Sequence, residues 1–424
     1  MNSNLYQIST LKNGIRVVTE NIPYVRSVAI GIWVGAGSRY ESKENSGISH
    51  FIEHLLFKGT KKRTAKDIAE TLESVGGQLN AFTAKEYTCY YARVLDEHVD
   101  LALDILADMF FNSMFSEAEM AKEREVIIEE IKMYEDTPDE LIHDFFSQTI
   151  WPNHPLGRPI LGTEESLQSL TRKDIIEFIE NHYVPENIVI AVAGKVDHEK
   201  IVPALDKLFG NSRKCLQVKN SFPPENQPQI QNLYKDINQV QICLGSPGLS
   251  QDDPQIYPLY VLNSVLGGGL SSRLVQEVRE ERGLAYSVYS YHSSYSDSGL
   301  FTFYAGTRPD NYEQVIKLIV EEALKIREKG ITEKELIKAK EQLKGSLFLG
   351  LESVGSRMTR LGRSLLTLNR LISPEEVVEK ISAVKQEDVQ KLAQELFEPS
   401  KFTITTIGPI KNIPDKDYFF AGVR

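Results

Sequence analysis

The sequence of 424 residues has few cysteines and no long apolar run. Its three cysteines, Cys89, Cys215 and Cys243, are odd in number and widely spaced, which argues against a disulfide framework and favours a reducing compartment. None has the spacing of a metal-binding cysteine pair, so we expect small buried hydrophobic residues at these positions. No stretch approaches about 18 apolar residues, and the sequence therefore predicts no transmembrane helix.

Positive charge is also in short supply, because 48 Lys and Arg residues stand against 59 Asp and Glu residues, for a formal net charge of -11. This balance argues against nucleic acid as a partner, since phosphates are bound by basic surfaces, and it permits basic substrates. The first residues, 1–8, lack both the basic and apolar regions of a secretory signal and the arginines of a transit peptide. We therefore expect a cytoplasmic protein with no membrane partner; a matured organellar protein would have the same features.

The composition, with 41% hydrophobic and 25% charged residues, is that of an ordinary globular protein long enough for two or three domains. A stretch rich in proline and polar residues, 222–228, divides the chain near its middle. The sequence thus predicts a first domain at 1–218, a linker at 219–230 and a second domain at 231–424.

The two halves have similar orders of predicted elements. The first half has strands at 27–34, 77–82 and 87–94, a short helix near residue 50, and a helix from about residue 96. The second half has strands at 240–244, 285–291 and 299–307, with helices at 256–266 and from about residue 310. The offset is about 210 residues throughout, which indicates an internal repeat. We predict an α+β fold of two homologous domains, each a mainly antiparallel sheet with helices.

Five consecutive residues, His50-Phe51-Ile52-Glu53-His54, carry the clearest chemical signal. On a helix, His50 and His54 share one face, and Glu53 flanks it. Two imidazoles and a carboxylate arranged in this way suit a zinc ion and a water that it activates, and H-x-x-E-H is the inverted form of a zinc-protease signature. The alternative is two surface histidines near a solvated glutamate. The apolar residues around the motif instead predict a largely buried helix, where ionisable groups need partners or a metal.

A third metal ligand must lie outside the motif, because a hydrolytic zinc site usually takes three protein ligands and Glu53 is reserved as the general base. A predicted helix around 123–131 offers two carboxylates, Glu123 and Glu130, two turns apart on a partly apolar face. Spacing alone does not choose between them, and it leaves open a charged face that is simply solvated.

These residues resemble the pattern of the pitrilysin/insulinase family of zinc peptidases, and most closely the branch with the mitochondrial processing peptidase and its bacterial relatives. In that family, H-x-x-E-H is followed by a ligand glutamate at a spacing that Glu130 matches. The resemblance runs over nearly the whole chain. It implies one zinc ion per chain on His50, His54 and Glu130, with Glu53 as the base and Glu123 supporting a ligand histidine.

The resemblance also implies a role for the second half, since in the family two such halves face each other across a chamber that holds the substrate. Arg279 and Tyr286 match an arginine and a tyrosine that complete the site from the opposite half, with Arg282 as the competing arginine. Arg279 would help to hold the substrate, and Tyr286 would hydrogen-bond the oxyanion at the scissile carbonyl. At the positions equivalent to His50, Glu53 and His54, the second copy has Leu259, Leu262 and Asn263. The second copy therefore lacks the metal ligands.

The strand predicted around 79–82 matches a family edge strand that pairs with the substrate backbone, with Asn80 and Ala81 in contact. Taken together, the resemblance implies a homodimeric zinc metalloendopeptidase that cleaves peptides or unfolded, presequence-like segments. The rival interpretations are a non-catalytic structural subunit of a larger assembly and a zinc-binding protein without turnover. Non-catalytic subunits of the family usually lose the zinc motif, and this chain retains it, so the sequence favours the enzyme.

Overall fold

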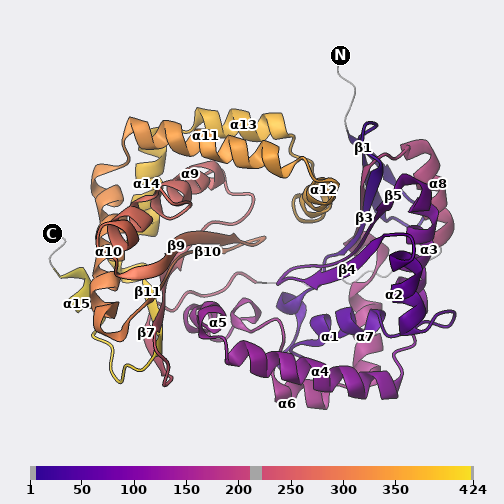
Figure 1. The fold of residues 1–424 in the computed structure, drawn as a ribbon, viewed down its shortest axis with the longest axis horizontal. Helices are drawn as coiled ribbons and strands as arrows, with labels where there is room; N and C mark the ends of the chain where they lie inside the picture. Colours follow the sequence, from indigo (N-terminus) through magenta and orange to yellow (C-terminus); the bar gives the residue numbers. More distant parts are fainter. Residues whose placement is uncertain (1–5, 211–221, 422–424) are drawn as a thin grey trace. The chain divides into compact units, whose positions relative to one another are not determined.

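The computed structural model of the protein describes residues 6–210 and 222–421, which divide into two compact units (Figure 1). The first unit takes the chain as far as Lys132, resumes at Pro159 for the rest of the first half, and adds Gly350–Leu371. The second unit takes Met133–Arg158, Phe222–Leu349 and the residues from Ile372 onward. Each unit therefore contains a segment from the other half of the sequence.

The first unit is built on a six-stranded sheet in the order β1-β2-β6-β3-β5-β4. All neighbouring strands pair antiparallel except β2 and β6, which are parallel. The strands are β1 (Tyr6–Thr10), β2 (Arg16–Asn21), β3 (Ser27–Val34), β4 (Gln78–Thr83), β5 (Thr88–Leu95) and β6 (Ile188–Gly194). Strand β4 lies at the edge of this sheet.

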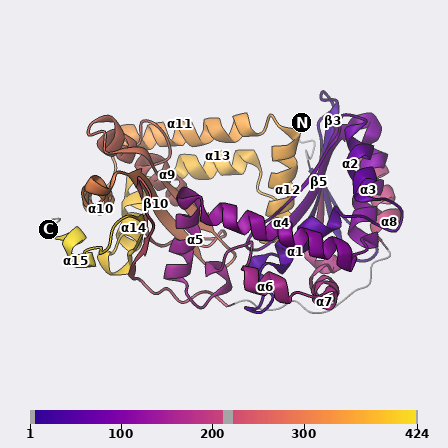
Figure 2. The same cartoon turned by 60° about the horizontal axis from the view of Figure 1, so that its bottom comes forward.

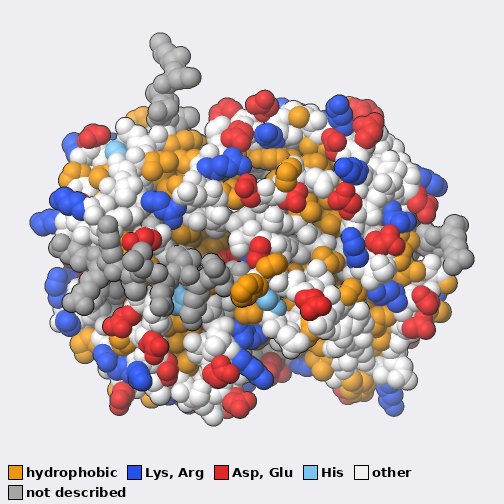
Figure 3. Space-filling model, turned by 180° about the vertical axis from the view of Figure 1, so that it is seen from behind, with side chains coloured by type: hydrophobic (Ala, Val, Ile, Leu, Met, Phe, Trp, Pro, Cys, Tyr) orange, Lys and Arg blue, Asp and Glu red, His pale blue; other side chains and the backbone are white. Residues whose placement is uncertain are grey.

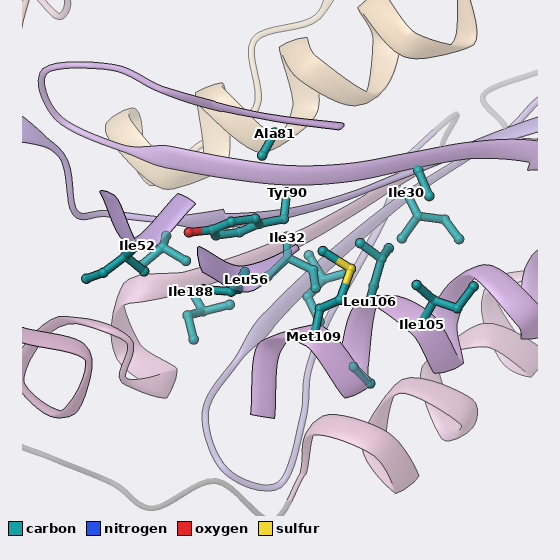
Figure 4. Packing of buried hydrophobic residues seen from close by; sticks show 14 of the residues in the cluster. Ile30, Ile32, Ile52, Leu56, Ala81, Tyr90, Ile105, Leu106, Met109 and Ile188 are labelled. Atoms are coloured by element: carbon teal, nitrogen blue, oxygen red, sulfur yellow. The ribbon is translucent and has the colours of Figure 1, made fainter. Parts of the chain in front are cut away.

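Most helices of the first unit pack on one face of its sheet. Alternation along β3 turns Val28, Ile30 and Ile32 toward this face, where they join one large apolar cluster with residues of the helices (Figure 4). The helices are α1 (Ile48–Leu56), α2 (Ala65–Glu73), α3 (Val99–Asn112), α4 (Glu117–Glu135), α6 (Glu164–Ser169), α7 (Arg172–His182) and α8 (His198–Phe209).

The other face of this sheet is covered by α12 (Val354–Leu368), which comes from the second half of the chain (Figures 1 and 2). Its apolar stripe of Val354, Met358, Leu361 and Leu365 packs on a cluster that includes the fully buried Trp33 of β3. The indole Nε1 of Trp33 donates to the Met358 sulfur at 3.4 Å. The long separation in sequence explains why the predicted domain of 1–218 lacks this helix.

The second unit repeats the design with a five-stranded sheet in the order β7-β11-β8-β10-β9, in which β7 and β11 are the parallel pair. The order and the place of the parallel pair match β2-β6-β3-β5-β4 of the first unit, as expected for an internal repeat. The strands are β7 (Ile230–Tyr234), β8 (Val240–Pro247), β9 (Ala285–Ser294), β10 (Gly299–Thr307) and β11 (Thr403–Gly408).

One face of the second sheet carries helices from its own half of the chain, and the other carries α5 (Pro138–Ile150) from the first half. Residues Ile142, Phe146 and Ile150 form a stripe on α5 that packs with Cys243 of β8 and Tyr304 of β10. The other helices are α9 (Ile256–Leu266), α10 (Tyr312–Lys329), α11 (Glu333–Gly350), α13 (Pro374–Ala383), α14 (Gln386–Leu396) and α15 (Lys416–Phe420).

The prediction of an α+β fold with two homologous, mainly antiparallel domains is confirmed. The boundaries at 218 and 231 differ from the observed units, because α5 and α12 bury their apolar stripes on the sheet of the other half. In the predicted linker, 219–221 lie outside the described residues, 222–229 have neither helix nor strand, and Ile230 begins β7.

Cys89 and Cys243 are buried and not joined in a disulfide, and burial raises the pKa of both thiols, while Cys215 lies outside the described residues. Within 6–210 and 222–421, no helix combines the length and apolarity that a bilayer crossing requires. On the face drawn in Figure 3, acidic and basic side chains are interspersed, and no broad basic patch gathers among the coloured residues.

Candidate metal centre

The H-x-x-E-H motif lies on α1, whose start is fixed by backbone and side-chain contacts. Gly47 precedes the helix with a φ of 90°, a left-handed conformation that glycine adopts without strain. The Glu41 carboxylate accepts hydrogen bonds from the N–H groups of Gly47 at 2.8 Å and Ser49 at 2.9 Å, satisfying donors at the helix N-terminus. The apolar residues of α1 are buried, as the sequence predicts, so the helix and its two histidines are held in place.

His50, His54 and Glu130 converge on one point. One potential ligand atom from each lies within 4.8 Å of the others, and this is the one group of metal-ligating type found in the described ranges. The Glu130 Oε2 atom lies 3.9 Å from His50 Nε2 and 3.8 Å from His54 Nε2. Glu130 comes from α4, so the site joins two helices far apart in sequence. The structure thus places Glu130, and not Glu123, opposite the two Nε2 atoms.

Glu123 lies behind His54, on the far side of the imidazole ring. Its Oε2 atom is 3.2 Å from His54 Nδ1, and its Oε1 atom is 2.8 Å from the Lys58 ammonium. The carboxylate is buried and acceptor-only, so it places the proton on Nδ1 and leaves the Nε2 lone pair directed toward Glu130. Sequence reasoning missed Lys58, although its position one helical turn after His54 was a usable signal.

The donor set fits zinc, for which two imidazole nitrogens and a carboxylate oxygen are typical ligands of an open, hydrolytic site. Burial, and then the neighbouring His54, lowers the pKa of His50 to about 3, so the ring is neutral and able to coordinate at neutral pH. Tetrahedral zinc with bonds of about 2.0–2.1 Å has ligand atoms roughly 3.3 Å apart. The two separations from Glu130 Oε2, 3.9 and 3.8 Å, are of this order, so the residues present fit a zinc ion.

Glu53 stands beside this group without belonging to it. Its Oε2 atom accepts a hydrogen bond from the Thr83 hydroxyl of β4 at 2.5 Å. Burial raises the pKa of Glu53, while the Thr83 bond and His54 act in the opposite direction. A buried carboxylate with a raised pKa is suited to accept and return a proton. Sequence reasoning did not select Thr83, whose place two residues after Ala81 puts it on the same side of the strand.

Asn80 and Ala81 lie on the edge strand β4, as predicted. Asn80 is exposed, whereas the Ala81 side chain is buried in the cluster between the sheet and α1 (Figure 4). The Ala81 N–H is bonded to the Asn80 side-chain oxygen at 2.8 Å, so it is turned away from β5. Because β4 is the edge strand of this sheet, its backbone can take a further partner on the side away from β5.

Arg279 and Tyr286 lie in the second unit and are in contact with each other. Arg279 is part of a π-helical turn, η5 (Val275–Glu280), and its guanidinium lies 4.9 Å from the centre of the Tyr286 ring. Tyr286, on the edge strand β9, is 78% exposed. Arg282 is instead paired with Glu277 at 2.5 Å. Of the two arginines considered from sequence, the structure therefore joins Arg279 to the tyrosine.

The comparisons with known proteins agree with the geometry. The profile described as Insulinase (Peptidase family M16) matches residues 16–164, and the profile described as Peptidase M16 inactive domain matches residues 169–343. The chain is 48% identical over 405 residues to a Bacillus subtilis protein named uncharacterized zinc protease YmxG, covering 96% of this chain and 98% of the relative. The chain belongs to peptidase family M16. The resemblance to the pitrilysin/insulinase family is thereby confirmed.

Other M16 relatives extend the comparison. A Rickettsia felis protein, also named uncharacterized zinc protease, is 44% identical over 405 residues, covering 95% of this chain and 98% of its own. A solved structure described as a protease from Helicobacter pylori is similar to this M16 protein with a TM-score of 0.90 and 26% identity, covering 95% and 99% of the two chains. A chain of complex III2 from Candida albicans, at a TM-score of 0.86 and 22% identity over 97% and 99%, shares the fold.

Proposed function

We propose that this M16 protein is a zinc-dependent metalloendopeptidase that hydrolyses peptides and unfolded, presequence-like segments. The observation that carries the proposal is the convergence of His50, His54 and Glu130, with Glu53 held next to them but outside the ligand set. The donor chemistry and the relatives named zinc proteases support zinc, one ion per chain, as the metal.

The roles of the residues follow from their contacts. Zinc, when bound, lowers the pKa of a water molecule and polarises a peptide carbonyl. Glu53 takes the proton of the attacking water and passes it to the leaving amine, which accords with its raised pKa. Glu123 keeps the His54 ring in the tautomer that exposes Nε2, and Lys58 compensates the charge of Glu123.

Substrate binding is proposed along β4. An extended peptide that pairs with the free edge of this strand is held through its backbone, so the requirement on its sequence is small. Asn80 and Ala81 are the contacts we propose there, with the substrate taking the place of the Asn80 side-chain oxygen on the Ala81 N–H. The net charge of -11 favours basic segments. We further propose, from the family resemblance, that Arg279 binds substrate and that Tyr286 stabilises the oxyanion.

The test is cleavage of a mixed peptide library by zinc-loaded protein, with cut sites mapped by mass spectrometry with and without a chelator. We expect cleavage that the chelator abolishes and added zinc restores. Glu53→Gln should stop cleavage while the zinc content, measured by elemental analysis, stays at one ion per chain. Glu130→Gln should lose the zinc itself.

Two outcomes contradict the proposal. Cleavage that survives Glu53→Gln removes Glu53 from the mechanism. An absence of cleavage by zinc-loaded protein favours a non-catalytic subunit of a larger assembly, the second candidate from the sequence. A homodimer in the cytoplasm stays a prediction, and light scattering of the purified protein tests its assembly state.

A further inference from the structure

A short segment before α1, the helix that carries His50 and His54, fixes the start of that helix. The segment is the turn η1 (Ser38–Tyr40) together with Glu41, and the Glu41 carboxylate binds the first N–H groups of α1. Glu41 is 4% exposed, so these hydrogen bonds are shielded from water. The position of α1 along its axis is therefore tied to η1.

The same segment also holds the hairpin between β4 and β5. Arg39 of η1 is fully buried and forms an ion pair with Glu86 in the hairpin turn, at 2.7 Å. The Arg39 N–H donates to the Lys85 carbonyl, also at 2.7 Å. A buried ion pair of this kind is costly to break, because each partner would be left as an uncompensated charge. The tip of the hairpin is therefore fixed relative to η1.

Glu53 and Thr83 meet where these two anchored elements come together. Thr83 is the last residue of β4, directly before the hairpin turn, and Glu53 lies on α1. Ala81 of β4 belongs to the same buried cluster as Ile52 of α1 (Figure 4). The 2.5 Å hydrogen bond between Thr83 Oγ1 and Glu53 Oε2 is thus made by two side chains whose backbones are held on both sides.

We propose that Thr83 is a positioning residue for Glu53. Its hydroxyl holds one carboxylate oxygen, Oε2, in a fixed place and leaves the other oxygen for proton transfer. This inference rests on the proposed peptidase function. Because Thr83 shares β4 with Asn80 and Ala81, the strand proposed to bind the peptide backbone also orients the general base. Strand β4 then sets both the register of the bound peptide and the orientation of the Glu53 carboxylate.

The expected effect is on turnover and not on binding. A general base contributes about 10²–10⁴ in rate, and a misplacement of about 1 Å costs roughly 10². Thr83→Val keeps the β-branched shape and removes the hydroxyl, so we expect kcat to fall by about 10–100-fold with KM changed by less than about 3-fold. Thr83→Ser keeps the hydroxyl and should retain most of the wild-type kcat.

The experiment compares two pairs that each differ in the hydroxyl, Thr against Val and Ser against Ala at position 83. For every variant, kcat and KM are measured on an internally quenched peptide chosen from the library, zinc affinity by competition with a chelator, and Tm by calorimetry. If the Val variant does not fold, the Ser and Ala variants still provide a comparison with and without the hydroxyl. Crystal structures of zinc-loaded wild type and Thr83→Val give the position of the Glu53 carboxylate without any need for turnover.

The proposal is supported if both hydroxyl-free variants lose kcat at unchanged zinc affinity and Tm, while the Glu53 carboxylate leaves its single position in Thr83→Val. It is overturned if Thr83→Val keeps the wild-type kcat, if its loss of kcat is matched by a loss of zinc, or if Glu53 stays in place. Failure of the peptidase function itself looks different, because wild-type protein then cleaves nothing while the crystallographic comparison still decides the role of Thr83.

Discussion

The contact between α12 and β3 gives the sharpest stability prediction. Gly362 of α12 is buried against Trp33, and a Cβ atom added there would lie 2.5 Å from two ring carbons, Cδ1 and Cε2. Carbon atoms in contact prefer about 3.5–4.0 Å. Gly362→Ala therefore forces the helix or the indole to move by about 1 Å. Gly355→Ala on the same helix is the matched control, since its Cβ would meet one atom, Ser353 Oγ, at an ordinary 3.5 Å.

The magnitude follows from two opposing effects. Replacing glycine by alanine in a helix interior stabilises it by about 0.5–1 kcal/mol, and the gain is no larger than this at Gly355, the second residue of α12. Overpacking a tight core costs typically about 1–3 kcal/mol. We expect Gly362→Ala to lose about 2 kcal/mol of unfolding free energy and Gly355→Ala to gain about 0.5 kcal/mol. The difference between the two variants is dominated by the packing cost.

The two tryptophans make the assay specific for one unit. The chain has two, Trp33 in the first unit and Trp151 in the second, both buried. In a Trp151→Phe background, tryptophan fluorescence during urea unfolding reports on the first unit alone. If Gly362→Ala proves as stable as Gly355→Ala in this assay, α12 does not lie on β3 as described, and the reasoning is refuted.

Three further predictions concern the metal centre and pH. Glu123→Gln should weaken zinc binding by about 10–100-fold in chelator competition, because Glu123 orients His54. Glu125→Gln, on the exposed side of the same helix, should leave zinc binding unchanged. Equal effects of the two substitutions would contradict the contact between Glu123 and His54. Removing zinc should lower the unfolding free energy of the first unit by about 4 kcal/mol if zinc was present at 1,000 times its Kd, seen as a lower urea midpoint of Trp33 fluorescence. An unchanged midpoint would speak against a zinc site in the folded protein. Burial opposes ionisation of Glu335, but hydrogen bonds from Arg273 and Thr332 outweigh it and hold its pKa at about 2. The stability that ionised Glu335 contributes is therefore complete above about pH 4.5 and is lost as the pH falls toward 2. The difference in urea midpoint between wild type and Glu335→Gln should shrink over that range. A constant difference would refute the ion pair between Glu335 and Arg273.

Elements with strong local patterns were predicted well from the sequence. The strand at 27–34 and the helix at 256–266 match β3 and α9 at both ends, because apolar periodicity and β-branched residues act within each segment. The metal-ligating residues followed from the spacing of His50 and His54 on one helix, and the family pattern added Glu130. Local sequence and a known motif were sufficient for these features.

Contacts between distant segments were not predictable in the same way. The stripes on α5 and α12 indicate that each helix buries one face, but they do not say which sheet receives it. Thr83 and Lys58 were missed because their partners, Glu53 and Glu123, lie 30 and more residues away and are brought near by tertiary packing. The choice between Glu123 and Glu130 likewise needed the position of α4 along its axis relative to α1, because two residues seven apart share one helix face and differ in axial height.

The exchange of α5 and α12 also bears on how the protein is made. The first unit cannot be completed until Gly350–Leu371 has left the ribosome, long after the rest of that unit. At about 5–20 residues per second, the roughly 150 intervening residues take on the order of 10–30 s to synthesise. For that time the face that carries Trp33, Val18 and Val189 has no covering helix. The order of synthesis therefore leaves this apolar face exposed on the nascent chain until α12 is made.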